Sequence, residues 1–525
     1  MSTMSWTLDP QPPVIWSVAG SDSGGGAGLS ADGRAAAAWG VHLCPVVAAV
    51  TAQNSLGAAA VFALSAEQID AQLRALRMDM RPAVIKTGLL GSVAAIEALC
   101  RCIDMLRRDA PVLLVVDPVL GATAGGAAFA DAPLIDAYRR ELLPRCDLLT
   151  PNRREARLLL GADSEGCDVP ALARRLRSLG AASVCITGGD DAAPHDLALD
   201  WLDGPQGQGW LALPRLPQAH HHGSGCTFAT AAAGGLARGF AMADAVVLAK
   251  MLTWAAVRDG HAAGAGAGPV RASAGFVFDR AALPVASFGD ESAVARWGQV
   301  LRAEPSMAQM AQMGIYAITS DPARVAALAA AGVAHIQLRI KGVEGLSEAI
   351  AAALAAVKNT ASQLWINDHA QLALAGGATA LHLGQEDWAA LHPTEREALL
   401  ASGLRLGVSS HSLWELARAR GLNPHYIACG PIWPTTTKAM PWRPQGINNL
   451  AWWVRMAGHP VLAIGGLLTP EQVRACAATG AAGACLVRAL DGAVEHSALR
   501  RFNEAWLQGR GDAAPPLLPP RPSLG

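Results

Sequence analysis

The chain has 525 residues, of which 51% are hydrophobic and 16% are charged. This length exceeds what one hydrophobic core usually organises, so we expect two or three domains, and the composition excludes a disordered protein. The 42 basic and 43 acidic residues leave a net charge of −1, without the positive excess with which proteins bind nucleic acids or membrane surfaces.

The ten cysteines are scattered along the chain, and none stands in a CxxC pair. We therefore expect neither a zinc site nor a disulfide framework. The first residues lack the basic start and apolar stretch of a signal peptide, and no run of about 18 apolar residues predicts a membrane span. These features favour a cytoplasmic protein whose partners are small molecules rather than nucleic acid or membrane.

Short apolar runs alternate with longer helical segments in the first half. Strands are expected over residues 14–19, 45–50, 83–87, 112–117, 148–150 and 183–187, with helices between them, for example over 66–78 and 169–179. This alternation is typical of an α/β domain with a mainly parallel sheet covered on both faces. The Ala- and Gly-rich run 262–268 has no periodicity, so we expect the first domain to cover 1–275 and a linker to cover 276–312.

Two glycine-rich segments in this half indicate a phosphate site. Residues 19–28 (AGSDSGGGAG) follow the first strand and could by themselves form an ordinary turn. Residues 222–227 (HGSGCT) open a predicted helix, where backbone N–H groups and the helix dipole attract an anion. Cys226 would lie in the first helical turn, a position that lowers thiol pKa values. A buried, inert cysteine is the alternative.

Further segments extend this pattern: TAQN (51–54), DPV (117–119), TPNRREA (150–156) and TGG (187–189). With them, residues 14–275 resemble the hydroxymethylpyrimidine/phosphomethylpyrimidine kinases of thiamine biosynthesis, which have a ribokinase-like fold. The resemblance implies that Cys226 and Asp32 are catalytic, Cys226 as a base or an oxyanion-side donor. It assigns the pyrimidine to Gln53, Gly20 and Ala27. It assigns Mg–ATP and the transferred phosphoryl group to Asn152, Glu155, Gly188, Gly189, Gly223 and Gly225.

This half departs from the family at two positions. Some members have lysine where Thr123 and Thr187 stand, so arginine or Mg²⁺ would have to neutralise the phosphates here.

From residue 313 a second pattern of apolar runs and helices repeats eight times. The runs cover 314–319, 335–341, 363–368, 380–384, 405–409, 426–432, 461–465 and 483–488. Eight β/α units of this length fit a small (β/α)8 TIM barrel over 313–510, and the count favours closure over an open eight-stranded sheet. Residues 511–525 form a proline-rich tail.

Polar residues gather where these strands should end, at the face on which such barrels hold their active sites. In QLRIK (337–341), strand alternation would place Gln337, Arg339 and Lys341 on one face. Their charges would then bind an anion or, as the alternative, form internal salt bridges with acidic residues. Asp368 and Asp387 follow neighbouring strands and suit Mg²⁺. Capping of a helix is a competing role for Asp387.

Residues 314–490 resemble thiamine-phosphate synthase through QLRIK, IND (366–368), HLGQED (382–387), LGVSSH (406–411), PTTTK (434–438) and AIGG (463–466). The resemblance assigns Mg²⁺ to Asp368 and Asp387. It assigns a pyrimidine diphosphate to Gln337, Arg339, Lys341, Asn367, Ser409 and Lys438. It assigns a thiazole phosphate to Thr435, Thr436, Thr437, Gly466, Val487 and Arg488. Family members usually have serine at position 488, and we expect His382 and His411 to be structural or secondary.

The two resemblances predict a bifunctional transferase. The first half would use ATP and Mg²⁺ to convert hydroxymethylpyrimidine, or its phosphate, to the diphosphate, and the barrel would couple that diphosphate to thiazole phosphate. One alternative makes the first half a pyrimidine-binding regulatory domain without kinase activity. Another joins a sugar or pyridoxal kinase to an unrelated phosphate-binding barrel. A homodimer is compatible with each of these.

Overall fold

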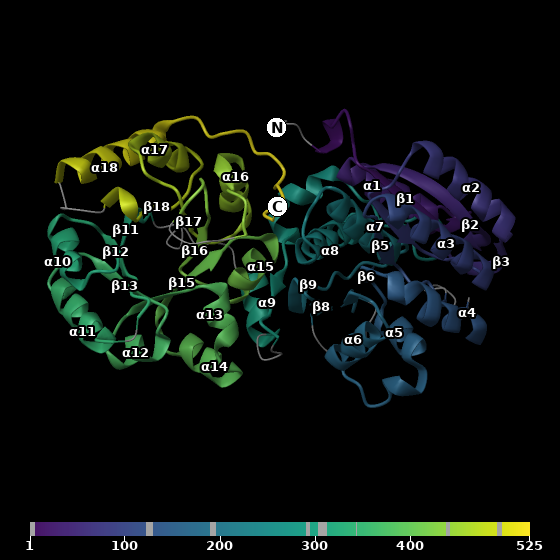
Figure 1. Ribbon diagram of the computed structural model, residues 1–525, viewed down its shortest axis with the longest axis horizontal. Coiled ribbons are helices and arrows are strands. Elements are labelled where there is room, and N and C mark those ends of the chain that lie inside the picture. The colour runs from purple at the N-terminus through teal and green to yellow at the C-terminus, as the bar shows by residue number, and fades with distance from the viewer. Residues whose placement is uncertain are drawn as a thin grey trace. The chain divides into compact units, whose positions relative to one another are not determined.

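The computed structural model describes residues 6–121, 130–189, 196–289, 294–302, 312–342, 344–436, 441–490 and 496–524. The chain divides into two compact units, Met1–Leu301 and Arg302–Gly525, each built on a sheet of its own (Figure 1). Among the helices that are described, none is both long and apolar enough to cross a membrane.

Over the described residues, the first unit contains a ten-stranded sheet in the order β10-β9-β8-β7-β6-β5-β4-β1-β2-β3. The strands are β1 (Val14–Asp22), β2 (His42–Asn54), β3 (Gly57–Ala63), β4 (Val84–Thr87), β5 (Leu113–Val116), β6 (Leu148–Leu149), β7 (Ser183–Ile186), β8 (Leu197–Gly204), β9 (Gly207–Pro214) and β10 (Val285–Ala286). The central strands pair in parallel, whereas β3 and β8 to β10 join in antiparallel pairs at the edges. The predicted mainly parallel sheet is confirmed.

The central strands of this sheet are buried along their length, because helices cover both of its faces. The helices are α1 (Gly28–Trp39), α2 (Ala66–Asp79), α3 (Val93–Asp109), α4 (Ala132–Ala137), α5 (Arg153–Leu160), α6 (Val169–Ser178), α7 (Ser224–Ala237), α8 (Met242–Arg258) and α9 (Val294–Arg302). Helix α7 is buried from Thr227 to Leu236, and its small residues let α1 and α8 pack closely against it. This packing places the start of α7 beside the glycine-rich segment that precedes α1.

The segment expected to be a linker, 276–312, is structured where it is described. Strand β10 pairs with β9 at the edge of the sheet. On α9, the Trp297 side chain is fully buried in the hydrophobic core that also contains Trp201 and Trp210. The apolar side chains of this segment therefore complete the first unit. The helical spacing of Trp297, Val300 and Leu301 is visible in the sequence, but the core on which they pack is not.

The second unit is a closed barrel of parallel strands in the order β11 to β18, because β18 pairs back onto β11. The strands are β11 (Gly314–Thr319), β12 (His335–Leu338), β13 (Gln363–Asn367), β14 (Ala380–Leu383), β15 (Arg405–Ser410), β16 (Tyr426–Cys429), β17 (Val461–Ala463) and β18 (Gly483–Leu486). Aromatic side chains of Tyr316, Trp365 and Tyr426 meet in its core. The predicted (β/α)8 architecture is confirmed, and the open sheet is excluded.

The helices of the barrel are α10 (Pro322–Ala330), α11 (Leu346–Val357), α12 (Ala370–Ala375), α13 (Gln385–Ala390), α14 (Pro393–Ala401), α15 (Leu413–Gly421), α16 (Gly446–Met456), α17 (Pro470–Ala478) and α18 (His496–Gly511). The tail after α18 packs on the same unit: the backbone N–H of Arg521 donates to Asn449 Oδ1 at 2.8 Å, and the N–H of Arg443 donates to the Ser523 carbonyl at 2.8 Å.

Candidate active sites

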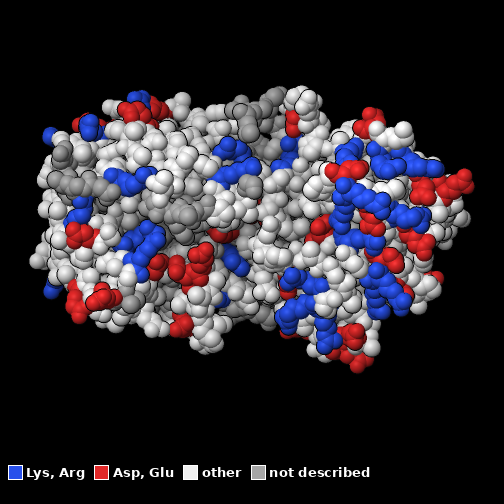
Figure 2. Space-filling view, in the orientation of Figure 1, with Lys and Arg blue, Asp and Glu red and all other residues white. Residues whose placement is uncertain are grey.

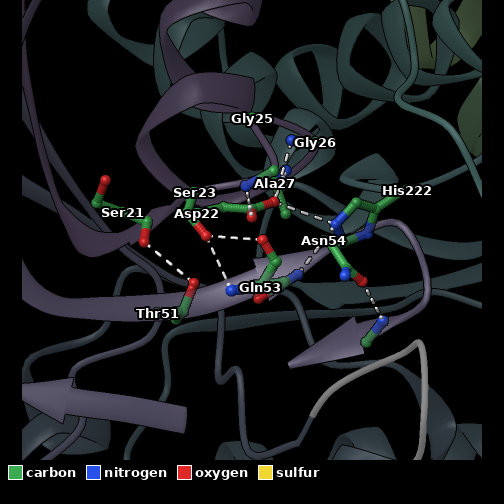
Figure 3. A network of polar contacts seen from close by, with 12 residues as sticks. Ser21, Asp22, Ser23, Gly25, Gly26, Ala27, Thr51, Gln53, Asn54 and His222 are labelled. Carbon is green, nitrogen blue, oxygen red and sulfur yellow. Dashed lines mark hydrogen bonds and ion pairs between the residues drawn. The ribbon is translucent and has the colours of Figure 1, made fainter. Parts of the chain in front are cut away.

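The glycine-rich segment between β1 and α1 folds around one carboxylate. Asp22 Oδ1 accepts the N–H of Gly24 at 2.8 Å, and Oδ2 accepts the N–H groups of Gly26 at 3.0 Å and Ala27 at 2.8 Å (Figure 3). Burial by itself would raise the pKa of Asp22, but hydrogen bonds from His222, Ala27 and Gly24 bring it below its usual value. Glycine is required at position 28, where φ is +54° and a Cβ would lie 2.2 Å from the Gly20 carbonyl oxygen. Gly20 and Ala27 therefore stand in one tight turn.

Gln53, predicted to bind the pyrimidine, lies beside this turn. Ser23 fixes its backbone, since Ser23 Oγ donates to the Gln53 carbonyl at 2.7 Å and accepts its N–H at 2.8 Å. The amide nitrogen of the Gln53 side chain lies 3.1 Å from His222 Nε2. That imidazole nitrogen is in turn 3.2 Å from Asp22 Oδ2 (Figure 3). The structure thus gathers Gln53 with a histidine and an aspartate that we had not assigned to the site.

The predicted anion site at the start of α7 forms next to the same turn. Gly223 caps the helix with φ +84°, and a Cβ there would lie 2.2 Å from the Gly26 carbonyl oxygen, so the two glycine-rich segments are in contact. A Cβ on Gly225 would meet no heavy atom within 4 Å. The backbone there is thus open to a ligand.

Cys226 lies in the first turn of α7 and carries a free, partly buried thiol. Burial raises its pKa to about 12, with Asp117 and Asp32 adding to the rise and Lys86 opposing it. The expectation that the helix terminus lowers the pKa is wrong for the ligand-free site, because desolvation outweighs the helix dipole. At neutral pH the group is a thiol and can donate a hydrogen bond.

Asp32 and Lys86 form a fully buried ion pair beneath Cys226. The Lys86 ammonium lies 2.9 Å from Asp32 Oδ1 and 3.1 Å from Oδ2, and 3.8 Å from Asp117 Oδ2. Ser17 and Thr230 also donate to Asp32, at 2.6 and 2.7 Å. Its oxygens are therefore occupied within the protein, and Asp32 holds Lys86 rather than lining a pocket.

Lys86 was missed from the sequence, although a signal existed. It is one of only five lysines in the chain, and it stands in β4, all four residues of which are buried. Its charge is retained, because the neighbouring Asp32, Cys226 and Asp117 raise the pKa of Lys86 despite its burial. For Asp117 the balance is reversed, since burial raises its pKa to about 6 against the attraction of Lys86.

The residues assigned to Mg–ATP surround the start of α5. Asn152 and Glu155 form a capping box: Asn152 accepts the Glu155 N–H at 2.8 Å, and Glu155 accepts the Asn152 N–H at 2.9 Å. The backbones of Asn152 and Thr187 form an isolated parallel β-bridge, which brings Gly188 and Gly189 close to the start of α5. The Gly188 N–H donates to Asp200 Oδ1 at 3.1 Å. Thr123 lies outside the described residues.

An arginine also lies at this point. A Cβ on Gly188 would lie 3.2 Å from an Arg153 guanidinium nitrogen. Arg153 therefore lies next to Gly188, the residue after Thr187, and whether its charge compensates for the lysine of other members stays a prediction.

In the barrel, the two predicted metal ligands come together. Asp368 follows β13 with φ +59°, and its carboxyl group hydrogen-bonds that of Asp387 on α13. Burial and the Asp387 charge raise the pKa of Asp368 to about 6, while Arg339 and His369 oppose the rise. Asp387 Oδ2 also accepts the Gly384 N–H at 3.0 Å, so it caps α13 as well. The two competing roles for Asp387 are compatible.

The residues of QLRIK are placed differently from the expectation. Strand β12 ends at Leu338, so the alternation does not continue to Arg339 and Lys341, which follow the strand end. Gln337 is buried and hydrogen-bonds Tyr316. Arg339 is partly buried near Asp368, whereas Lys341 is exposed. Asn367 is buried at the end of β13.

A chain of hydrogen bonds crosses the barrel to Ser409. His382 Nε2 lies 2.8 Å from Ser409 Oγ, and His382 Nδ1 lies 2.8 Å from the Tyr426 hydroxyl. That hydroxyl is 2.8 Å from the hydroxyl of Tyr316. Burial, with Arg339 and His411 nearby, lowers the pKa of His382 to about 4, so the ring is neutral. The secondary role expected for His382 is therefore to hold Ser409.

The residues assigned to the thiazole phosphate follow β16, β17 and β18. Arg488 donates to Thr436 Oγ1 at 3.1 Å. Gly466 has φ +74°, and a Cβ there would lie 2.7 Å from Trp433 Cβ, so only glycine fits against this loop. Thr435 and Val487, which directly precede Thr436 and Arg488 in the chain, are partly buried. Thr437 and Lys438 lie outside the described residues.

The described charged side chains on the face drawn in Figure 2 are mixed in sign. Acidic and basic groups adjoin one another, as the nearly zero net charge leads one to expect.

Comparison with known proteins assigns a family to each half of the chain. Residues 22–271 match the family model for phosphomethylpyrimidine kinase, and residues 315–490 match that for thiamine monophosphate synthase. A probable thiamine biosynthetic bifunctional enzyme of Oryza sativa subsp. japonica, described as chloroplastic, is 33% identical over 87% of this chain and 81% of its own length. The chloroplastic thiamine biosynthetic bifunctional enzyme TH1 of Arabidopsis thaliana is 32% identical over 87% of this chain and 85% of its own.

A solved structure of pyridoxal kinase from Bacillus subtilis with ADP covers 50% of this chain and 98% of its own length, at 29% identity and a TM-score of 0.46. The synthase match excludes an unrelated barrel, and the kinase match extends along the first unit to residue 271. The chain therefore belongs to the family of bifunctional thiamine-biosynthetic enzymes, in which a phosphomethylpyrimidine kinase is joined to a thiamine-phosphate synthase.

Proposed function

We propose that the first unit uses Mg–ATP to phosphorylate hydroxymethylpyrimidine and then its phosphate. The observation that supports this proposal is the contact between the two glycine-rich segments, in which Gly223 lies against Gly26 and the neighbouring His222 reaches the side chain of Gln53. The pyrimidine binds at Gln53, whose carboxamide can accept from an exocyclic amine and donate to a ring nitrogen. The phosphates bind at the open backbone of Gly223 and Gly225.

In the first transfer, the substrate hydroxyl oxygen attacks the γ-phosphorus of ATP, an O–P bond forms, the bond from that phosphorus to the β,γ-bridging oxygen breaks, and ADP leaves while the hydroxyl proton passes to solvent. In the second transfer, an oxygen of the pyrimidine phosphate is the nucleophile. Such transfers require positioning and charge neutralisation more than covalent help. The N–H groups at the start of α7 and the Cys226 S–H donate to the phosphoryl oxygens. Lys86, kept charged by Asp32, supplies a fixed positive charge beneath them. Asn152, Glu155, Gly188 and Gly189 line the nucleotide side, with Arg153 beside Gly188.

For the barrel, we propose that the thiazole nitrogen attacks the pyrimidine methylene, forming a C–N bond while the C–O bond to diphosphate breaks. Gln337, Asn367 and Ser409 hold the pyrimidine diphosphate, and Arg339, Lys341 and Lys438 neutralise the leaving group. Ser409 is oriented by His382. Thr435, Thr436, Thr437, Gly466, Val487 and Arg488 bind the thiazole phosphate.

Asp368 and Asp387 fit a magnesium ion. Two carboxyl groups meet in a partly buried position, where burial first and the charge of Asp387 second raise the pKa of Asp368 to about 6. A divalent cation relieves the repulsion between the two carboxylates, and one or two carboxylates completed by water and phosphate oxygens are a typical Mg²⁺ environment. When bound, Mg²⁺ supplies positive charge to the departing diphosphate.

The test is a coupled assay with hydroxymethylpyrimidine, ATP, Mg²⁺ and thiazole phosphate, followed by detection of thiamine phosphate. We expect product from the complete mixture. Cys226→Ala should stop production from the free alcohol but not from the pyrimidine diphosphate, and Asp368→Ala should stop both. A Cys226→Ala protein that phosphorylates at the wild-type rate would remove Cys226 from the mechanism.

We also propose that the enzyme works in the cytoplasm, since all ten cysteines are free thiols and thiols persist in reducing compartments. The plant relatives are described as chloroplastic. Cell fractionation with an antibody to this chain tests the assignment, and recovery in an organelle fraction would contradict it.

A further inference from the structure

His222 Nε2 has two partners in the kinase site. It lies 3.1 Å from the side-chain nitrogen of Gln53 and 3.2 Å from Asp22 Oδ2 (Figure 3). Asp22 already accepts three backbone N–H groups of the glycine-rich turn, so its position is set independently of the histidine. The same ring nitrogen therefore connects a fixed carboxylate to the amide that reads the pyrimidine.

The two contacts of this nitrogen make opposite chemical demands. With a hydrogen on Nε2, the imidazole donates to Asp22 and requires the oxygen of the Gln53 amide. Without that hydrogen, the imidazole accepts from the Gln53 amide nitrogen, as the recorded orientation has it. Whether or not His222 Nε2 carries the hydrogen, one orientation of the Gln53 amide forms a hydrogen bond with it. The reversed orientation brings two donors or two acceptors together. The hydrogen on His222 and the orientation of Gln53 are thus coupled.

The orientation of this amide decides which pyrimidine fits. A carboxamide edge offers one acceptor and one donor, and it pairs with the exocyclic amine and ring nitrogen of a 4-aminopyrimidine. A 4-oxopyrimidine presents the reverse pattern, a carbonyl oxygen and a ring N–H. An amide that turns freely pairs with both substrates, whereas an amide held in one orientation leaves a buried group of the wrong substrate without a partner.

The imidazole is itself held in place. Its side chain is only 13% exposed, and it packs so closely on Gly26 that a Cβ there would lie 2.1 Å from His222 Cδ2. Its backbone N–H donates to the Gly268 carbonyl, and its carbonyl accepts from the Val270 N–H, each at 3.1 Å. A ring fixed on three sides can impose an orientation on Gln53, which is attached through a flexible side chain.

We propose that His222, anchored by Asp22, is a specificity-determining residue of the kinase, which orients the Gln53 amide and so selects a 4-aminopyrimidine over its 4-oxo counterpart. This inference rests on the proposed binding of the pyrimidine at Gln53. His222 acts through Gln53 and is a positioning residue, not a catalytic one.

The test compares kcat/KM for hydroxymethylpyrimidine and for its 4-oxo analogue in the full-length protein. For His222→Leu, which fills similar space without ring nitrogens, we expect the preference for the amine to fall by about tenfold or more, as for a lost buried hydrogen-bond match. The KM for ATP should stay near the wild-type value. His221→Leu is the matched control at the adjacent position and should keep the wild-type preference.

A second variant covers the case in which His222→Leu does not fold. The side chain of His222→Asn is polar but too short to reach the position of Nε2, so it loses the contacts with both Gln53 and Asp22, and the same loss of preference is expected. If a folded variant raises KM for both pyrimidines equally and keeps their ratio, His222 only fills space and the inference is overturned. A wild-type enzyme that phosphorylates neither pyrimidine would instead contradict the proposed function.

Discussion

The ammonium of Lys86 on β4 lies 2.9 and 3.1 Å from the two carboxylate oxygens of Asp32 on α1, and both side chains are completely buried. Burial of two charges is tolerated here because Ser17 and Thr230 also donate to the carboxylate. The pair lies next to Cys226, whose thiol pKa responds to both charges. In the proposed mechanism, Lys86 therefore has two roles: it pairs with Asp32 in the core, and it supplies positive charge for phosphoryl transfer.

Lys86→Met is expected to destabilise the first unit by about 3–5 kcal/mol, because Asp32 would remain as an unpaired buried charge. Calorimetry of the full chain should show a lower transition temperature for one unit, while synthase activity from the pyrimidine diphosphate is unchanged. The double variant Asp32→Asn/Lys86→Met should recover much of the stability but not the kinase activity. Recovery of both would show that Lys86 is only structural.

The thiol of Cys226 should react slowly with iodoacetamide at neutral pH. Its pKa is raised to about 12, so the protonated form dominates below that value and the thiolate fraction grows about tenfold for each pH unit. Mass spectrometry of the modified peptide between pH 7 and 10 should show a rate that rises throughout, without a plateau. A plateau near pH 8 would mean that the thiol has an ordinary pKa and that the site is less desolvated than the structure indicates.

Gln53→Ala should raise the kinase KM for hydroxymethylpyrimidine far more than the KM for ATP. A lost buried hydrogen-bond pair costs about 1–3 kcal/mol, which corresponds to roughly 5- to 150-fold. Steady-state kinetics with each substrate varied in turn separates the two effects. A rise confined to the KM for ATP would place the nucleotide, not the pyrimidine, at Gln53.

Asp368→Ala should abolish formation of thiamine phosphate from the pyrimidine diphosphate, with kcat reduced more than affinity. Arg339 would still attract the diphosphate, but Asp387 alone would not retain a metal ion. Glu386→Ala is the matched control, because it removes a neighbouring acidic group on α13 that is exposed. Kinase activity of the same preparation reports folding. Synthase turnover near the wild-type rate with an unchanged Mg²⁺ requirement would disprove the metal assignment.

The sequence by itself predicted the architecture of both units, and it placed the candidate site residues on segments that the fold brings together. Strand and helix periods are local properties, so the eight barrel strands could be located closely, and β11 was placed at both ends correctly. Cys226 could be singled out because it follows glycines that open a helix, and Asp368 and Asp387 because they follow neighbouring strands, whereas Gln53 was implied only by the family resemblance. The hairpin of β8 and β9 was not anticipated, although its two strands are neighbours in the chain, and neither was the packing of α9, whose partners Trp201 and Trp210 are distant in the sequence.

Only the tertiary structure decided how these residues act on one another. Asp32 and Lys86 are separated by 54 positions and Asp22 and His222 by 200, so no local pattern connects them. Burial, which depends on the whole fold, reversed the expected shift of the Cys226 pKa. Chemical groups are encoded residue by residue, but hydrogen bonds and desolvation arise only when distant segments are packed together. This is why a family resemblance in the sequence predicts Gln53 as a pyrimidine ligand, whereas its contact with His222 is visible only in the fold.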